Sequence, residues 1–340
     1  MHKKIWALAA APLLLAACGG PAAEQAESGG AEGDATALTV ALPTTSCLVS
    51  FENYVAESEG FFADEGVDIA IEAVNGSAGV LQAIAAGQAD FGGPGATPVL
   101  AALERGEDVK YFLNSSPGGS FWLVTPSDSG IGSAAELEGK RIGVATADGN
   151  EVGFVDAIMS NDGVEADGYE KITVGEGGTA VAAFERGEID AYAASADGYA
   201  TIEHAGIPLE DITTDSVDYM FGNGYAAPAA LIEEQREALV GFGRAWHRAS
   251  QLGAEDPQKV IEICADYQPQ EVEDEEYALS ILELLAESRQ PVSPDDEFGH
   301  MHPEHWEAIL ADAVEAGTVT DDSLSLEGAY TNDLVAELNE

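Results

Sequence analysis

The sequence predicts an α/β fold of two similar lobes that face each other across a cleft. The main observation is a repeated unit, which covers residues 74–98 (VNGSAGVLQAIAAGQADFGGPGATP) and residues 176–200 (EGGTAVAAFERGEIDAYAASADGYA). Each copy has a Gly-rich turn, an Ala-rich helical run, a glycine at position 87 or 187, and a short strand that ends in small residues. A cleft between the two units is the simplest use of the repeat.

The small residues of the first copy predict a place where a ligand can reach the backbone. Ser77, and Thr179 in the second copy, are in position to cap a helix, and Gly87 is in position to end it in the left-handed conformation. Side chains are nearly absent across residues 91–97, so a ligand can approach the main chain there. The N–H groups at the start of the following helix can then point at the ligand.

Strands and helices alternate along the rest of the 340-residue chain, which is long enough for two domains. Residues 38–42 alternate as a strand does, and Pro43 stops it. A helix over residues 51–62 and a strand over residues 67–74 follow. Further elements are predicted as a strand over residues 141–145 and helices over residues 152–159, 232–251, 257–267 and 275–288.

The N-terminus predicts export and lipid anchoring. Lys3 and Lys4 precede an apolar run over residues 5–17, which is too short to span a bilayer. The run ends in LAAC, which is similar to a bacterial lipobox, so residues 1–18 are expected to be a lipoprotein signal peptide and Cys18 the lipidated residue. The alternative is an ordinary signal peptide with a chance cysteine. Residues 19–37, rich in Gly, Ala, Glu, Ser and Pro, are expected to form a flexible linker.

These features predict a domain outside the cytoplasmic membrane, held to it through Cys18. Cys47 and Cys264 could pair in an oxidising compartment. A single distant pair gives no disulfide framework, however, and we expect both thiols to be free.

The charge excludes some classes of partner. Asp and Glu number 62 against 13 Lys and Arg, for a formal net charge of -49. This charge repels nucleic acid and anionic lipid surfaces. In salt near 1 M the screening length falls to about 3 Å, which reduces self-repulsion. We therefore interpret the acidity as a solvated surface suited to a saline habitat; dedicated cation binding would need clustered carboxylates.

Several motifs in register resemble one family. The chain contains EGFFADEGVDI, AGQADF, GATPVLAALERGEDVKYF, LEGKRIGV at residues 137–144, AFERGEIDAY and AGTVTDDSLSLEGAYTNDLV. From about residue 38 to residue 338 they resemble the periplasmic solute-binding proteins of ABC importers. The branch indicated contains receptors for alkanesulfonates, nitrate, taurine and the thiamine pyrimidine.

The resemblance implies a type II periplasmic-binding-protein fold, in which each lobe has a central sheet flanked by helices. It places lobe one at residues 38–126 plus 225–340 and lobe two at residues 127–224. The crossovers are expected near residues 121–126 and 225–231. It also implies a monomer that closes by hinge bending on a small organic solute, similar to a pyrimidine or to a sulfonate or nitrate. The solute would pass to an ABC permease and its ATPase.

Candidate ligand-binding residues follow strands, because α/β sheets bind ligands beyond the carboxyl ends of their strands. Five loops, at residues 44–47, 75–78, 92–97, 146–151 and 195–198, offer hydroxyls or bare backbone N–H groups; an ordinary turn is the alternative for each. The predicted residues are Thr44, Thr45, Ser46, Asn75, Gly76, Ser77, Gly93, Gly95, Thr97, Thr146, Gly149, Asn150, Glu151, Ser195 and Asp197.

Aromatic residues are the other candidates. Trp122 and Tyr192 could stack on a flat ligand, as could Phe51 or Tyr225, although an aromatic on a strand is more often part of the core. Basic residues are scarce near the five loops, so an anion site built on an Arg has little support. Helix N-termini could still hold a sulfonate or nitrate.

Metal binding and catalysis find little support in the sequence. His300, His302 and His305 have a spacing that can bind zinc, but an incidental surface cluster is favoured. No hydrolase elbow, zincin motif or phosphate loop is present in the sequence. A eukaryotic relative of the branch makes the thiamine pyrimidine with a Cys-rich iron motif, whereas residues 91–98 lack Cys. We therefore expect no enzyme, cofactor or metal; a pyrimidine-synthesis enzyme and a ligand-sensing module are the alternatives.

Overall fold

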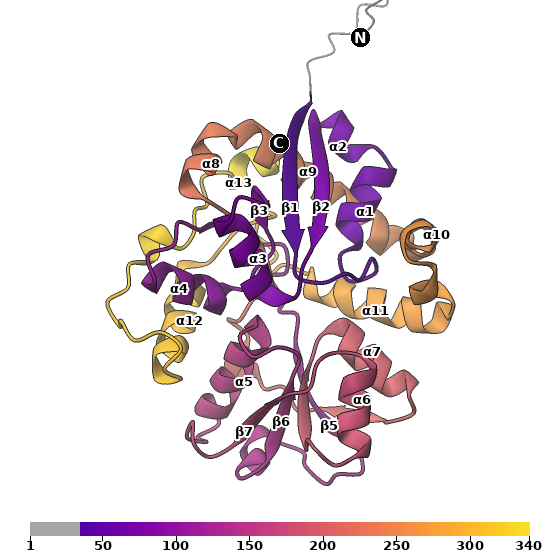
Figure 1. Ribbon diagram of the computed structural model, residues 1–340, viewed down its shortest axis with the longest axis vertical. Helices are drawn as coiled ribbons and strands as arrows, with labels where there is room; N and C mark the ends of the chain where they lie inside the picture. Colours follow the sequence, from indigo (N-terminus) through magenta and orange to yellow (C-terminus); the bar gives the residue numbers. More distant parts are fainter. Residues whose placement is uncertain (1–34) are drawn as a thin grey trace, which may run out of the picture. The chain divides into compact units, whose positions relative to one another are not determined.

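The computed structural model describes residues 35–340, whose first sheet has five strands in the order β2-β1-β3-β10-β4 (Figure 1). β1 pairs in parallel with β2 and β3, and β10 pairs antiparallel with β3 and β4. The strands are β1 (Thr36–Leu42), β2 (Val67–Ala73), β3 (Phe91–Gly92), β4 (Lys110–Leu113) and β10 (Tyr225–Ala227). The predicted linker over residues 19–37 is two residues too long, because Thr36 and Ala37 already pair with β2.

The second sheet repeats this arrangement in the order β7-β6-β8-β5-β9. β6 pairs in parallel with β7 and β8, and β5 pairs antiparallel with β8 and β9. The strands are β5 (Trp122–Pro126), β6 (Arg141–Val144), β7 (Glu170–Thr173), β8 (Ala191–Ala194) and β9 (Leu209–Asp211). Two sheets of matching topology confirm the two-lobed α/β fold predicted from the repeat.

Helices flank both sheets. Those that connect strands are α1 (Phe51–Ser58), α2 (Phe61–Asp64), α3 (Gly76–Ala85), α4 (Ala96–Glu104), α5 (Asn150–Asn161), α6 (Gly178–Glu185) and α7 (Ala196–His204). The C-terminal ones are α8 (Ala229–Glu234), α9 (Arg236–Glu255), α10 (Pro257–Tyr267), α11 (Glu275–Ser288), α12 (Pro303–Glu315) and α13 (Val335–Leu338). Short 3₁₀ turns are η1 (Ala134–Leu137), η2 (Asp215–Val217), η3 (Pro269–Val272) and η4 (Leu326–Gly328). α11 packs on α7 and α12 packs on α5, so the C-terminal helices contact both lobes.

The chain passes between the sheets twice, through residues 114–121 and residues 212–224. The first crossover was expected at residues 121–126, but this segment forms β5 of the second sheet. Its alternating apolar residues belong to a paired strand, in which Val124 lies opposite both Tyr192 and Asp211. The second crossover was expected at residues 225–231 and ends instead before β10.

The repeated units end as predicted but begin differently. Gly87 and Gly187 adopt φ values of 65° and 62°, the left-handed conformation that ends each helix. The predicted caps at Ser77 and Thr179 are wrong, because Asn75 and Gly177 occupy the N-cap positions without a side-chain bond. The Ser77 Oγ instead accepts a hydrogen bond from the Gly95 N–H at 3.0 Å, which ties the second and third loops of the first sheet together.

A disulfide joins Cys47 to Cys264 with a Cα–Cα distance of 5.7 Å, so the expectation of free thiols is wrong. The two cysteines are 217 residues apart in sequence. They meet because α10 packs against α1, and Cys47 lies in the loop that leads into α1. The disulfide fixes this loop at the carboxyl end of β1.

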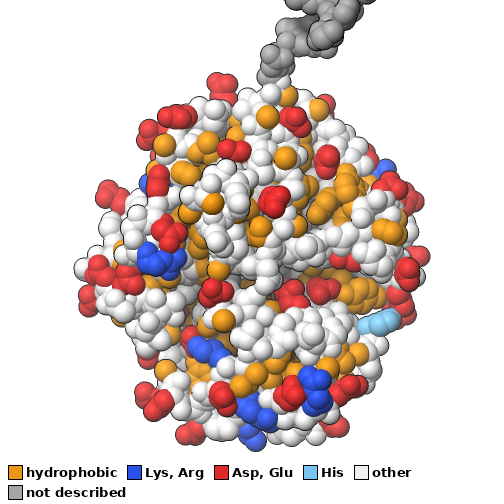
Figure 2. Space-filling view, in the orientation of Figure 1, with side chains coloured by type: hydrophobic (Ala, Val, Ile, Leu, Met, Phe, Trp, Pro, Cys, Tyr) orange, Lys and Arg blue, Asp and Glu red, His pale blue; other side chains and the backbone are white. Residues whose placement is uncertain are grey.

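The predicted signal peptide and the lipid anchor at Cys18 lie outside the described residues. Within residues 35–340, no helix is long and apolar enough to cross a membrane. The face shown in Figure 2 carries many Asp and Glu side chains and few Lys and Arg side chains.

Candidate functional site

A cavity of about 150 Å³ lies between the two sheets. It is open to segments that follow β1, β2 and β3 of the first sheet and β6, β7 and β8 of the second, which are the carboxyl ends of the parallel strands. This is the position where α/β sheets bind ligands. Its volume is comparable to that of cavities that hold one benzene-sized ring.

Ten of the seventeen predicted ligand-binding residues line this cavity. They are Thr44, Asn75, Gly76, Ser77, Gly93, Thr146, Asn150, Glu151, Ser195 and Asp197. Seven others do not line it, namely Thr45, Ser46, Gly95, Thr97, Trp122, Gly149 and Tyr192.

Gly95 and Thr97 lie where α4 approaches α5. A Cβ atom on Gly95 would lie 2.3 Å from the Asn150 side chain, and one on Gly153 would lie 2.7 Å from the Thr97 Oγ1. These residues are small because the two lobes touch at this point. The space beside Gly149 is also filled, since a Cβ atom there would lie 2.1 Å from the Glu151 Oε2.

The loop before α1 uses its polar groups internally. The Glu271 carboxylate on η3 accepts hydrogen bonds from the Ser46 Oγ at 3.3 Å and from the Cys47 N–H at 3.0 Å. The Gln268 side chain donates to the Thr45 carbonyl. These contacts turn Thr45 and Ser46 toward the C-terminal helices and leave Thr44 at the cavity.

The candidate aromatic residue that lines the cavity is not one of the two that the sequence analysis favoured. Tyr192 is buried, and its hydroxyl donates to the Gly175 carbonyl at 3.0 Å. Trp122 packs against Tyr199 with ring centroids 6.1 Å apart. Tyr225 lines the cavity instead, and its hydroxyl accepts a hydrogen bond from the Asn53 amide at 3.0 Å. Of the residues considered for stacking, only Tyr225 faces the cavity; Phe51 lies in the core.

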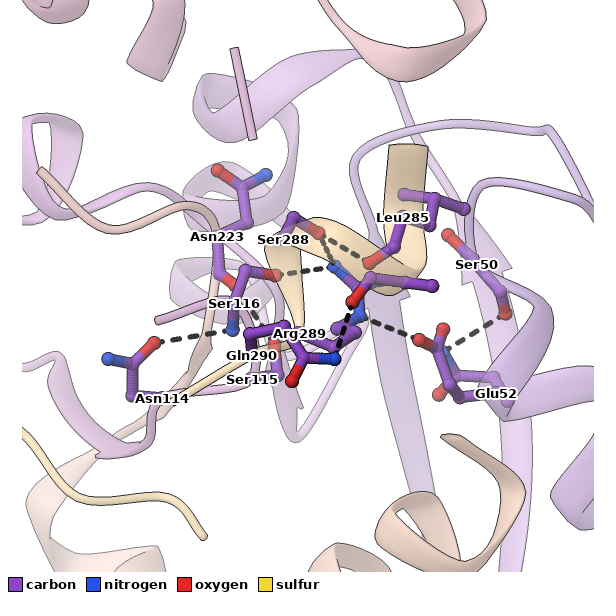
Figure 3. A network of polar contacts seen from close by, with 12 residues as sticks. Ser50, Glu52, Asn114, Ser115, Ser116, Asn223, Leu285, Ser288, Arg289 and Gln290 are labelled. Atoms are coloured by element: carbon purple, nitrogen blue, oxygen red, sulfur yellow. Dashed lines mark hydrogen bonds and ion pairs between the residues drawn. The ribbon is translucent and has the colours of Figure 1, made fainter. Parts of the chain in front are cut away.

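An arginine that the sequence analysis did not predict lies at the cavity (Figure 3). The Arg289 Nε is 2.8 Å from the Glu52 Oε1, and its Nη1 donates to the Ser116 Oγ at 2.7 Å and the Ser288 Oγ at 2.9 Å. The side chains of Arg289 and Glu52 are 14% and 1% exposed. The expectation that basic residues are scarce at the site therefore needs correction, although this arginine is already paired.

The two crossovers form the floor between the lobes and add residues that the sequence analysis also missed. The Ser115 Oγ donates to the Asn223 carbonyl at 2.9 Å, and the Gly222 N–H donates to the Ser116 carbonyl at 2.8 Å. The remaining lining residues are Leu42, Pro43, Val49, Ser50, Asn53, Ser120, Phe121, Ala145, Glu176, Ala196, Gly224, Trp246 and Leu285. The run of small polar residues at 114–120 was the local signal for this floor.

Three carboxylates line the second-sheet side. The Glu151 Oε1 accepts hydrogen bonds from the Thr146 N–H at 2.8 Å and its hydroxyl at 2.7 Å. The Asp197 Oδ1 accepts from the Tyr277 hydroxyl at 2.6 Å. Desolvation by the surrounding loops, followed by the charges of Asp197 and Glu151, raises the pKa of Glu176 to about 7, even though the residue is exposed by surface area.

The histidine cluster lies away from these carboxylates. The His302 Nε2 is 3.0 Å from the Asp296 Oδ2, and its Nδ1 is 3.6 Å from the Glu304 Oε1. No three His, Cys, Asp or Glu side chains within residues 35–340 are grouped to hold a metal ion. The interpretation of His300, His302 and His305 as an incidental cluster stays a prediction.

Comparison with known proteins identifies one family and its relatives. The family described as "NMT1/THI5 like" matches residues 50–260. A curated relative from Legionella pneumophila, named 4-amino-5-hydroxymethyl-2-methylpyrimidine phosphate synthase, is 26% identical over 64% of this chain and 69% of its own length. Relatives from Aspergillus parasiticus and Schizosaccharomyces pombe carry the same name at 27% and 25% identity, over 66% and 62% of their lengths.

Solved structures give the fold. The alkanesulfonate-binding protein SsuA from Xanthomonas axonopodis pv. citri, bound to MOPS, has a TM-score of 0.70 at 17% identity, over 88% of this chain and 99% of its own. The periplasmic nitrate-binding protein NrtA from Synechocystis PCC 6803 has a TM-score of 0.66 at 13% identity, over 90% and 88%. These matches confirm the resemblance to periplasmic binding proteins.

The names of the curated relatives contradict one expectation. They describe an enzyme, which contradicts the sequence-based prediction that the chain is not an enzyme. That prediction relied on missing catalytic motifs and on the lack of Cys in residues 91–98, and a missing motif is a weaker argument than a match that covers most of the chain.

Proposed function

Because the chain belongs to the NMT1/THI5-like family, we propose that it is a solute-binding receptor that captures a small organic solute between its two lobes. One observation carries the proposal: loops at the carboxyl ends of strands in both sheets line a single cavity of about 150 Å³. A ligand there would contact both lobes at once, as transport receptors require. The receptor would deliver the solute to an ABC permease and its ATPase.

Hinge closure follows from the connections between the lobes. The crossovers at residues 114–121 and 212–224 are the two covalent links between the sheets. A ligand enters when these links bend and the loops separate, and it then stabilises the closed form, because only that form lets both loop sets contact it. The small residues where α4 meets α5 allow the close approach.

The family comparisons suggest two solute classes for this cavity. One is a pyrimidine similar to a thiamine precursor, after the pyrimidine phosphate that the names of the curated relatives give as their product. The other is a sulfonate or nitrate, after the structural neighbours. A micromolar ligand needs about 8 kcal/mol of binding free energy, which several hydrogen bonds and one buried ring can supply.

The proposal includes an extracytoplasmic location, in keeping with the periplasmic proteins that share the fold. Removal of residues 1–17 and lipidation of Cys18, which would then be N-terminal, would anchor the receptor as a monomer. Mass spectrometry of the membrane fraction tests this: a diacylated N-terminal Cys18 is expected, and a Cys18→Ala variant should lose the lipid. An unmodified N-terminus in the parent protein would refute the anchor.

The names of the curated relatives favour a second candidate function, synthesis of the thiamine pyrimidine phosphate. Both functions need a ligand in the same cleft, so the site geometry serves either. An assay for release of the pyrimidine phosphate after metal loading separates them: turnover supports the synthase.

The receptor function is tested by a thermal-shift screen of pyrimidines, flavins, sulfonates, taurine and nitrate, because a ligand that binds the folded state raises the melting temperature. Each binder is then added during small-angle X-ray scattering. We expect a smaller radius of gyration with ligand. Binding without compaction would refute hinge closure, and a binder that reconstituted permease fails to import would refute the transport role.

A further inference from the structure

Three carboxylates reach the cavity from three successive strand ends of the second sheet. Glu151 is in the first turn of α5, Glu176 follows β7, and Asp197 is in the first turn of α7. They lie close enough for Asp197 and Glu151 to raise the pKa of Glu176. The second-sheet wall of the cavity therefore concentrates negative charge.

No basic side chain on that wall balances this charge. Among residues 35–340, Arg289 is the only Lys or Arg that lines the cavity, and its charge is paired with Glu52 on the first-sheet wall. Arg141 pairs with Asp190 at the opposite end of β6, with an Nε–Oδ2 distance of 3.2 Å. Like charges that lie close together without a basic partner repel one another, so a ligand of opposite sign would be stabilised there.

A second, independent observation comes from two amides. Asn150 is 3% exposed and lines the same cavity, and its Oδ1 has no hydrogen-bond partner within the part of the chain that the structure describes. The Oδ1 of Asn223, which also lines the cavity, is likewise buried without a partner there. Buried acceptors without donors are rare in folded proteins, and a ligand that carries N–H groups would satisfy them.

We propose that the cleft selects a small organic cation, a planar group of about one ring that carries several N–H donors, such as an amidinium or a protonated amino-substituted ring. The charge faces Glu151, Glu176 and Asp197, and the N–H groups reach the unpartnered amide oxygens. The proposal rests on the proposed function for this cleft and specifies the ligand. It predicts a preference opposite to that of an alkanesulfonate- or nitrate-binding protein, because an anion would meet the three carboxylates.

Cation binding at this wall is coupled to proton release. The titratable groups that face Glu176 are Glu151 from α5, Asp197 from α7, and Tyr192 from β8. Burial, followed by the charges of the three carboxylates, raises the pKa of Tyr192. Tyr277 from α11 holds Asp197. Since the pKa of Glu176 in the free protein is about 7, a cation binds more tightly as the pH rises through 7 and expels the proton.

Matched probes of one ring test the charge preference. Benzamidine is a planar cation, benzamide is its neutral isostere, and benzenesulfonate is an anion of similar size. Calorimetry or ligand-observed NMR with the whole soluble domain, residues 19–340, should give at least tenfold tighter binding for benzamidine than for the other two at pH 8. The benzamidine affinity should fall several-fold at pH 6.

Variants assign the effect to the carboxylates. Glu176→Gln should lower the benzamidine affinity about fivefold or more and remove most of its pH dependence, with benzamide binding unchanged. Glu165→Gln, an exposed residue of the same lobe outside the cavity, is the matched control and should behave as the parent. Melting curves establish that each variant is folded.

The outcomes separate this proposal from the receptor function. Tighter binding of benzamide or benzenesulfonate, or no measurable benzamidine binding at millimolar concentration, overturns the cation proposal. If a neutral or anionic solute from the screen still compacts the protein, the receptor function stands without it. Cation binding that leaves the radius of gyration unchanged would instead support the charge preference and count against hinge closure.

Discussion

The two walls of the cleft come from sheets with the same strand order, but they differ in whether their charged side chains are paired. On the first-sheet wall, the Glu52 carboxylate and the Arg289 guanidinium neutralise each other, and the guanidinium also donates to the hydroxyls of Ser116 and Ser288 (Figure 3). On the second-sheet wall, Glu151, Glu176 and Asp197 have no basic partner at the cavity among residues 35–340. The charges of the first wall are balanced without a ligand, whereas a cationic ligand would balance those of the second wall.

The walls also differ in how they are held. The Cys47–Cys264 disulfide and the Glu271 hydrogen bonds fix the first-sheet loop that carries Thr44. The loops of the second wall are held by hydrogen bonds, such as those between Glu151 and Thr146 and between Tyr277 and Asp197. Breaking the first wall should therefore cost stability, while changing the second should alter binding and pH response.

The largest expected effect is the loss of the buried ion pair. Arg289→Ala leaves Glu52 buried without its partner, and the free energy of unfolding should fall by about 3–5 kcal/mol. Urea unfolding measures the change. Arg186→Ala removes an exposed pair with Glu188 and should cost less than about 1 kcal/mol. Equal stabilities of the two variants would show that the first wall does not depend on this pair.

Removal of the disulfide comes next. In a Cys47→Ala, Cys264→Ala double variant the free energy of unfolding should fall by about 2–4 kcal/mol, because the bond constrains a long loop of the unfolded chain. Calorimetry with and without reductant makes the comparison, and the double variant should be insensitive to the reductant. A thiol titration that finds two free cysteines in the unreduced parent protein would contradict the structure here.

The sequence placed five candidate residues on each wall, but it missed the long-range contacts that hold the first. Thr146, Glu151, Ser195 and Asp197 each follow a strand within a few residues, so a local pattern identifies them. Arg289 reaches Glu52 across 237 residues and Ser116 across 173, and the cysteines are 217 apart. Contacts at such separations depend on how the C-terminal helices pack, which no local pattern encodes.

The repeated units show the same limit on a smaller scale. Glycine spacing predicted both helix ends, because the left-handed conformation at Gly87 and Gly187 is a local requirement. It could not show that Gly95 and Thr97 contact the other lobe instead of the cavity, since that depends on how the lobes meet. Both roles require small residues, and the sequence alone does not distinguish them.

Disturbing the contact between the walls should have a smaller effect, which is on ligand affinity. A Cβ atom on Gly95 would lie 2.3 Å from the Asn150 side chain, so Gly95→Ala should hinder closure. We expect about tenfold weaker binding of the best solute from the screen and less compaction in scattering. Gly178→Ala, where a Cβ atom meets nothing within 4 Å, is the matched control. Unchanged affinity for Gly95→Ala would mean that the lobes need not touch here when ligand is bound.

The smallest effect concerns Glu176 in the free protein. Its pKa of about 7 in the folded state lies above the ordinary value of 4.5, so the folded protein binds more protons than the unfolded chain between these two pH values. The contribution of Glu176 to stability therefore falls as the pH rises from about 4.5 to 7, by less than about 1 kcal/mol because solvent screens this open side chain. Melting temperatures of the parent and Glu176→Gln should agree near pH 4.5, and the variant should be the more stable above pH 7. A parent that stays equal to the variant across this range would show that the pKa of Glu176 is not raised in the folded state, and would remove the basis for the expected pH dependence of benzamidine binding.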